Sequence, residues 1–401
     1  MEMEAVRGGV TAPTGFLAAG VACGIKKRGR DLSLIFSQRP AVAAGLLTTH
    51  PLRAPCVDRA ARLIRQGVAR AIVANSGSAN CCTGRRGRED CAEMARQAGR
   101  HLGIPASQVF VASTGVIGRF LPMQRVASGI RRASHSLSRT GSTLAAEGIM
   151  TTDTRPKEIA IRFRWGGEPV TVAGIAKGAG MVAPHLATML AFLTTDARIE
   201  RGLLAQILKL WVARTFNRIT IDGDPSTNDM VLALANGASP APAIRRGSPG
   251  HQRFQDALGA VCRTLAHELV RDGEGVTRLF TVRVWGAESD SAAQRLARGV
   301  ADSPLVRTMV AGRDPNWGRI AAAAGAAGVP IQPGRLTIRL GRRTVFHRGE
   351  PVRVSRQQLL EQVDHPEVQF GIQVGRGPGE ATVLSADLTE EYVRINAKYT
   401  S

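Results

Sequence analysis

One stretch of the chain, residues 177–190, combines residue types that would let a protein cut its own backbone. Its glycines allow left-handed or strained backbone, and Pro184 disfavours a helical conformation of Ala183. Thr188 follows at the start of an apolar run. Its hydroxyl could attack the carbonyl of Ala187 and free the α-amine of Thr188, and a threonine whose α-amine is its own base is an established nucleophile. The pattern is equally typical of the start of a strand, so residue types alone leave both interpretations open.

Lys177 opens this stretch in a chain that uses arginine at nearly all of its basic positions. Lysine and arginine together number 53, of which six are lysine and the remaining 47 are arginine. An α-amine freed at Thr188 would have a reference pKa of about 7.7–8.0, close to that of a useful base at neutral pH. A neighbouring cation would lower that pKa further. Because lysine can be tuned or deprotonated and arginine cannot, Lys177 is the candidate neighbour; the alternative is a surface lysine after a strand.

The chain resembles the ornithine acetyltransferase family, also called the bifunctional glutamate N-acetyltransferase family of arginine biosynthesis. The resemblance covers nearly the whole chain in the family's order. Besides residues 177–190 it is carried by blocks at 9–13, 75–80, 112–118, 149–154, 191–196, 216–218, 222–224, 226–229, 272–275, 314–319, 387–389 and 392–397. Ser78 and His185 depart from the pattern, because asparagine is usual at both positions. His185 either alters the rate of self-cleavage or is an exposed turn residue, and we favour the turn residue.

The resemblance implies a cut between Ala187 and Thr188, which gives an α chain of residues 1–187 and a β chain of residues 188–401. Thr188 is then the nucleophile, and Thr114 with Gly115 resembles the family's oxyanion hole. A glycine N–H can approach a tetrahedral oxyanion with no side chain in the way, and a threonine hydroxyl adds a second donor. Without the resemblance, Thr114 and Gly115 would be interpreted as a strand-to-helix turn with a threonine N-cap.

The resemblance also implies substrate contacts by six residues: Thr151, Lys177, Thr188, Glu274, Asn396 and Ser401. Thr151 fits the family's substrate-contacting threonine best, and Thr152 is the alternative. The Glu274 carboxylate could bind a cationic amine of ornithine, while Asn396 and Ser401 could hold the carboxylate of the amino acid. On residue types alone, Glu274 would belong to an acidic turn, and Asn396 and Ser401 to a frayed terminus.

Two further polar blocks receive no catalytic role. We expect the first to support the site from behind, through Asp224, Ser226, Thr227 and Asn228. The second, residues 314–318, predicts a turn followed by a helix, with Asn316 as the N-cap and Trp317 as a packing anchor.

The reaction implied by the resemblance is a ping-pong acetyl transfer in arginine biosynthesis. Thr188 would take the acetyl group from N-acetyl-L-ornithine, release ornithine and pass the group to L-glutamate. Some members of the family also use acetyl-CoA, but no glycine-rich pyrophosphate loop is evident here. A self-processing aminopeptidase or amidase, with water as the acceptor, is the first alternative. A catalytically silent, basic nucleic-acid-binding protein is the second, and the intact set of site residues argues against it.

Composition limits the class of protein. The formal charge is +21, but the basic residues are spread along the chain with only short clusters such as residues 26–28, and no nucleic-acid-binding signature appears. The six cysteines have neither zinc-site nor disulfide-scaffold spacing. No signal pattern or membrane-length apolar run is present. We therefore expect a cytoplasmic enzyme with no metal, no bound cofactor and no nucleic-acid or membrane partner; the resemblance implies an α2β2 heterotetramer.

The predicted elements that must position these residues alternate irregularly between strand and helix. Strands are predicted at 32–36, 71–74, 109–112, 188–194, 230–235, 278–285, 336–340, 368–374 and 381–385. Helices are predicted at 89–102, 122–131, 142–150, 203–214 and 254–270, and a long loop at 237–250. This order favours an α/β (α+β) fold in layers with mixed sheets. The resemblance implies a layered architecture shared with self-processing aminopeptidases of the DmpA type.

Overall fold

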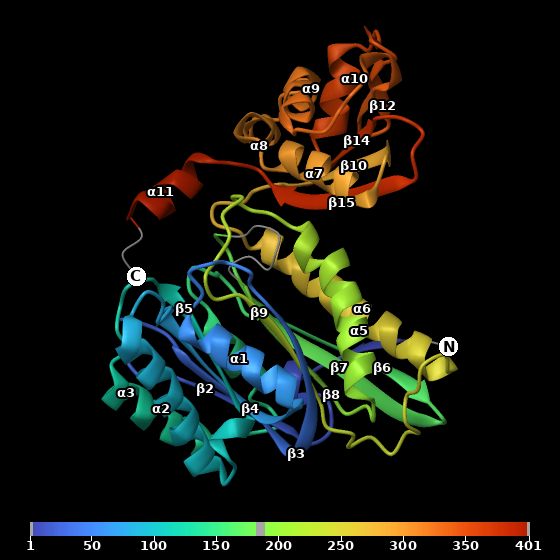
Figure 1. Cartoon of the computed structure of the whole chain (residues 1–401). Coiled ribbons are helices and arrows are strands. Elements are labelled where there is room, and N and C mark those ends of the chain that lie inside the picture. Colours follow the sequence, from blue (N-terminus) through green and yellow to red (C-terminus); the bar gives the residue numbers. More distant parts are fainter. Residues whose placement is uncertain (1–2, 182–188, 399–401) are drawn as a thin grey trace. The chain divides into compact units, whose positions relative to one another are not determined.

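The computed structural model describes residues 3–181 and 189–398 and divides into two compact units. The first unit comprises residues up to Asn217 together with Asp224–Leu269, and the second comprises Arg218–Gly223 and the residues from Val270 onward. Each unit has a sheet and a hydrophobic core of its own (Figure 1). No helix within these described ranges combines the length and the apolar character that a membrane crossing needs.

In its described residues, the first unit contains a nine-stranded mixed sheet. Its strands are β1 (Glu4–Val6), β2 (Phe16–Val21), β3 (Leu32–Leu47), β4 (Val68–Ser78), β5 (Val109–Val116), β6 (Lys157–Trp165), β7 (Glu168–Lys177), β8 (Leu190–Thr195) and β9 (Met230–Ala235). They lie in the order β1-β6-β7-β8-β9-β3-β4-β5, with β2 paired to β3. The pairs β8–β9 and β4–β5 are parallel, and the other pairs are antiparallel.

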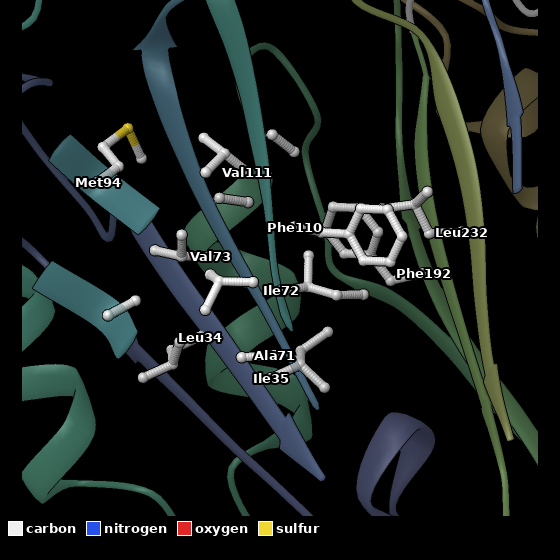
Figure 2. Close-up of a cluster of buried hydrophobic side chains, with 14 of the residues drawn as sticks. Leu34, Ile35, Ala71, Ile72, Val73, Met94, Phe110, Val111, Phe192 and Leu232 are labelled. Atoms are coloured by element: carbon white, nitrogen blue, oxygen red, sulfur yellow. The ribbon is translucent and has the colours of Figure 1, made fainter. Parts of the chain in front are cut away.

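The 16-residue strand β3 joins the two halves of this sheet. Its first part pairs with β2 and β4 and its last part with β9, and its register against β4 shifts between Phe36 and Ala41. Side chains of both halves meet in one core, where Phe110 of β5 lies near Phe192 of β8 and Leu232 of β9 (Figure 2). The two halves therefore face each other across this core, an arrangement that can bring residues of β5 and β7 together.

Helices pack against the sheet of the first unit (Figure 1). They are α1 (Pro55–Gln66), α2 (Gly84–Leu102), α3 (Met123–His135), α4 (Ser142–Ile149), α5 (Arg201–Arg214) and α6 (Pro249–Arg271). Proline at the first position of α1 and left-handed glycines after α1 and α2 mark their ends, with φ of +81° at Gly67 and +64° at Gly103. Helix α6 packs on β7 so closely that a Cβ at Gly174 would lie 2.9 Å from Leu265 Cδ1.

The second unit contains a six-stranded mixed sheet in the order β13-β12-β11-β14-β10-β15, counted over its described residues. The strands are β10 (Leu279–Ala287), β11 (Thr337–Leu340), β12 (Arg343–His347), β13 (Glu350–Pro351), β14 (Glu367–Gln373) and β15 (Gly379–Ala386). The helices are α7 (Asp290–Ala301), α8 (Pro304–Ala311), α9 (Trp317–Ala326), α10 (Arg356–Val363) and α11 (Glu390–Lys398). Its core includes Phe280 and Phe370, whose ring centroids lie 5.4 Å apart.

The predicted fold class, α/β with mixed sheets, is confirmed. Each predicted strand and helix has a counterpart, but several bounds differ. Strand β3 runs far beyond residue 36, and β8 begins at Leu190, while residue 188 lies outside the described residues. The helix expected from 122 begins at Met123 because Pro122 occupies its N-cap. The β6–β7 hairpin, α1 and α7 were not predicted, although Gly166 and Gly167, with φ of +60° and +86°, mark the hairpin's turn.

Candidate active site

The predicted oxyanion residues lie at the end of β5. Thr114 is buried, and Gly115 has a φ of +125°, a conformation that side chains other than glycine's rarely adopt. A Cβ at Gly115 would lie 2.5 Å from the carbonyl carbon of Gly77, on the parallel neighbour β4. Gly77 also has a positive φ, of +99°. The two strands therefore end in a close backbone-to-backbone contact that depends on glycine at position 115.

Lys177 contacts Thr114 although the two residues are far apart in the chain. It is the last residue of β7, pairs with Leu190 of β8, and is 1% exposed. Its Nζ donates a hydrogen bond to Thr114 Oγ1 over 3.2 Å. A buried lysine is costly unless its charge is compensated, so this position beside a hydroxyl distinguishes Lys177 from a surface lysine. Two of the sequence-predicted site residues are thus brought together.

Asp153 is the anionic centre beside this pair. Its Oδ1 accepts hydrogen bonds from Lys157 Nζ at 2.7 Å and the Gly178 N–H at 2.8 Å, and its Oδ2 accepts the Thr151 N–H at 3.0 Å. Burial raises the pKa of Asp153, but the charges of Lys177 and Lys157 and the Gly178 N–H outweigh it and lower the pKa to about 2. Asp153 is therefore ionised at neutral pH. Thr151, a predicted substrate contact, is positioned here through its backbone.

The beginning of β8 is fixed by a second buried aspartate. Asp229 Oδ1 accepts the N–H of Met189 at 2.9 Å, and the Met189 carbonyl accepts the N–H of Met230 at 3.2 Å. The nitrogen of this Met189 N–H forms the peptide bond with Thr188, the proposed nucleophile. Asp229 therefore contacts the peptide group that follows Thr188. The other oxygen, Oδ2, is buried and accepts no hydrogen bond from the described residues. Burial raises the pKa of Asp229 well above its usual range.

Asn228, which we expect to support the site, contacts the backbone of β5 next to Thr114. Its Nδ2 donates to the carbonyls of Ala79 at 2.7 Å and Ser113 at 2.8 Å. Ser113 directly precedes Thr114, and its hydroxyl donates to Asn75 Oδ1 at 2.7 Å. Because Asn228 holds Ser113 of β5 and Asp229 holds Met189, the residue before β8, the block 226–229 contacts two sides of the candidate site.

Three sequence-predicted residues, Thr188, His185 and Ser401, lie outside the described residues. In the second unit, Asn396 Nδ2 donates to Glu274 Oε2 at 2.7 Å, so two predicted substrate contacts touch each other. Ser78, which departs from the family pattern, is buried and donates its hydroxyl to the Arg119 carbonyl at 2.8 Å.

Sequence reasoning missed the roles of Asp153 and Asp229. Both belong to blocks that carry the resemblance, but their burial and their partners could not be inferred from spacing. Within the described ranges, no cluster of three or more histidine, cysteine or acidic side chains is arranged to hold a metal ion. Among the described residues, a buried amine, a hydroxyl and a glycine turn converge, with two buried aspartates bonded to the backbone around them. Hydrogen-bond donors arranged in this way can stabilise an oxyanion, which is one requirement of acyl transfer.

Comparison with known proteins gives a consistent result. The model of the ArgJ family matches residues 17–401. The arginine biosynthesis bifunctional protein ArgJ of Symbiobacterium thermophilum is 48% identical over 400 residues, which are 99% of this chain and 100% of the relative. The crystal structure of the Bacillus halodurans protein of the same name is 38% identical, with a TM-score of 0.50 over 52% of this chain and 98% of that chain. A Mycobacterium tuberculosis ornithine acetyltransferase complexed with ornithine is 39% identical, with a TM-score of 0.43 over 46% and 98%.

Proposed function

The chain belongs to the ArgJ family, and we propose that it transfers an acetyl group from N-acetyl-L-ornithine to L-glutamate through an ester on Thr188. It is an acetyltransferase of arginine biosynthesis, since both the family match and the S. thermophilum relative span almost its whole length. The observation that carries the proposed mechanism is the hydrogen bond from Lys177 to Thr114, next to the strand that begins two residues after Thr188.

The first step of the proposed mechanism is self-cleavage. The Thr188 hydroxyl attacks the Ala187 carbonyl, the peptide C–N bond breaks, and the α-amine of Thr188 takes up the hydroxyl proton. Water then hydrolyses the Ala187–Thr188 ester, which leaves a carboxylate on Ala187 and restores the hydroxyl of Thr188. The contact of Asp229 with the Met189 N–H supports this step, because it fixes the backbone directly after the nucleophile.

The second step is acetyl transfer. The free α-amine of Thr188 takes the hydroxyl proton while the oxygen attacks the acetyl carbonyl of N-acetylornithine. The Thr114 hydroxyl and the Gly115 N–H are the proposed donors to the oxyanion, and removing one such donor typically slows catalysis about 10²–10³-fold. The C–N bond breaks, ornithine leaves with the proton on its amine, and the acetyl ester remains. The amine of glutamate then attacks this ester and gives N-acetylglutamate and free Thr188.

Lys177 is the proposed cationic neighbour of the α-amine. A positive charge beside it would lower its pKa and keep it unprotonated at neutral pH. The buried contact of Lys177 with Thr114 supports this role, because it places the ammonium at the oxyanion residues. Thr151, Glu274, Asn396 and Ser401 are each proposed to contact the amino-acid part of the substrates. The contact between Glu274 and Asn396 within the second unit supports this role for those two residues.

The name of the S. thermophilum relative includes the word bifunctional, which supports a second activity with acetyl-CoA as the acetyl donor to glutamate. Water as the acceptor would make the protein an amidase, and the dependence of N-acetylornithine consumption on glutamate separates the two. An α2β2 assembly is proposed from the family resemblance. A reducing compartment such as the cytoplasm fits the six free cysteines.

The experiment that tests the proposal combines mass spectrometry with an acetyl-transfer assay. The purified 42.6 kDa chain is expected to give two fragments under denaturing conditions, one of which begins Thr188-Met189-Leu190. Thr188→Ala should remain whole and inactive, whereas the control Thr188→Ser retains a hydroxyl and should still be cut. Turnover by uncut Thr188→Ala would contradict the nucleophile assignment.

A further inference from the structure

Lys26 lies on a loop that one buried carboxylate holds in place. The loop connects β2 to β3, and Asp31 at its end has no exposed surface. The Asp31 carboxylate accepts the consecutive N–H groups of Cys23, Gly24, Ile25 and Lys26 at 2.5–3.0 Å. A carboxylate with four backbone donors fixes the position of the loop. The backbone from which the Lys26 side chain extends is therefore rigidly placed.

The stem of Lys26 lies against the glycine turn of the candidate active site. A Cβ at Gly77 would lie 2.8 Å from Lys26 Cγ and 3.0 Å from Ile25 Cγ2, so the loop packs directly on Gly77. Gly77 in turn contacts Gly115, the proposed oxyanion residue. Lys26 is thus separated from Gly115 by a single backbone layer.

The Lys26 ammonium reaches the same turn as Asp153. Its Nζ donates to the carbonyl of Met150 at 2.8 Å, and the described residues provide no acceptor for its other two N–H groups. Burial lowers the pKa of Lys26; Asp31 and Asp153 oppose that change and Lys177 adds to it. The ammonium is thus close enough to Asp153 and Lys177 to sense both charges, while part of the side chain remains open to solvent.

The charges of Lys157 and Lys177 act on the ionised Asp153, and the Lys26 ammonium bonds to the carbonyl of Met150, three residues before it. Lys157 donates to Asp153, and Lys177 donates to Thr114. Lys26 makes one hydrogen bond to the described residues, which leaves two of its donors for a ligand. N-acetylornithine and glutamate share an α-carboxylate, which is the natural partner for an ammonium with free donors.

We infer that Lys26, rather than Asn396 and Ser401, binds the α-carboxylate common to the acetyl donor and the acetyl acceptor. This inference rests on the proposed function and adds a substrate-binding residue to the same site. One anchor for both substrates suits a ping-pong reaction, because ornithine leaves before glutamate enters. The ammonium would hold each α-carbon at the same distance from the oxyanion turn.

The test compares two donors that differ only in the carboxylate, N-acetyl-L-ornithine and N-acetyl-1,4-diaminobutane. Lys26→Met is expected to lower kcat/KM about 10–100-fold for N-acetylornithine and to change it less than about threefold for the diamine. The control Lys27→Met removes the same charge from the exposed neighbouring residue and should affect neither donor. Equal losses on both donors, or equal behaviour of the two variants, would overturn the inference. Absence of transfer by the wild-type enzyme would instead contradict the proposed function.

Calorimetry and intact mass complete the test. If the wild type does not turn over the diamine, calorimetry replaces kinetics: Lys26→Met should weaken binding of ornithine but not of 1,4-diaminobutane, and equal binding changes would overturn the inference. Intact mass shows whether each variant has matured. If Lys26→Met has not, Lys26→Arg, which retains the charge, should keep the preference for the carboxylated ligand, and loss of that preference would again count against Lys26.

Discussion

Two buried aspartates of the candidate site, Asp153 and Asp229, have pKa values shifted in opposite directions. Asp153 bonds the N–H of the residue after Lys177, and Asp229 bonds the N–H of the residue after Thr188. Burial raises the pKa of Asp153, but Lys177, Lys157 and the Gly178 N–H outweigh it. Burial also raises the pKa of Asp229, and there the hydrogen bonds of Met189 and Ser226 and the charge of Lys177 do not outweigh it. Carboxyl groups whose pKa values are shifted apart by their surroundings are typical of catalytic sites. Asp153 provides a fixed charge, while the raised pKa of Asp229 belongs to a carboxyl group that bonds the backbone directly after the proposed nucleophile.

Replacing Asp153 with asparagine tests the fixed charge. Asp153→Asn removes the anion of the buried pair with Lys157, and removing one partner of a buried pair typically destabilises a protein by about 3–5 kcal/mol. The folded pKa of about 2 is below the usual value, so this stabilisation is present above pH 4 and is lost as the pH falls from about 4 to 2. Urea unfolding should therefore show a large deficit at pH 7 that shrinks in acid.

The matched control is Asp58→Asn, which removes an exposed ion pair with Arg53. Exposed pairs contribute about 0–1 kcal/mol, so this variant should unfold close to the wild type. Equal stability of the Asp153 and Asp58 variants at pH 7 would show that Asp153 is not the buried anion described above.

For single residues, the sequence identified candidate site side chains but did not identify their interaction partners. Residue types and resemblance selected Thr114 and Lys177, and the structure places them 3.2 Å apart. Asp31, Asp153 and Asp229 received no role, because a buried carboxylate is defined by the N–H groups and ammonium groups around it. Those partners come from distant strands and loops, so spacing along the chain could not identify them.

At the scale of the elements, the contact between the ends of β4 and β5 requires glycine at position 115. Gly115→Ala would place a Cβ 2.5 Å from the Gly77 carbonyl carbon while φ remains at +125°. Because the obstructing atoms are backbone, the turn itself would have to move. We expect a destabilisation of at least about 1–3 kcal/mol and loss of acetyl transfer even in molecules that fold, measured by thermal unfolding and by kcat.

Gly103→Ala is the control for this prediction. Gly103 also has a positive φ, of +64°, but a Cβ there would meet no atom within 4 Å. The variant should lose about 1 kcal/mol of stability and keep full activity. A Gly115 variant as active as the Gly103 variant would contradict the role of the close contact.

The sequence patterns predicted which segments form helices or strands more reliably than they predicted which strands pair. The strand at 230–235 was predicted with the bounds that the structure has, since an apolar run between turn residues leaves little choice. The length of β3 was not foreseen, because its middle residues Gln38, Arg39 and Pro40 are polar or lack an N–H, and tertiary pairing overrides that preference. The sheet order, with β8 between β7 and β9, carries no local signature at all.

For the whole molecule, the placement of β8 predicts how the proposed fragments behave. The cut would fall between β7 and β8, which pair over six residues from Val172–Thr195 to Lys177–Leu190. The β-chain strands β8 and β9 also share a core with β4 and β5 of the α chain. We expect both fragments to elute together under native conditions and to separate only in denaturant, as size-exclusion chromatography with mass spectrometry would show. Separate native peaks would contradict this arrangement.

The position of β8 decides whether the protein can refold after it has been cut. A precursor can form the β7–β8 pairing within a single molecule, where the effective concentration of the two strands is high. After a cut at 187–188, the same pairing requires two different polypeptides to meet, and recovery from unfolding becomes dependent on dilution. Folding would then have to precede the cut. A cut molecule that unfolds and whose two fragments separate could not refold until the fragments met again.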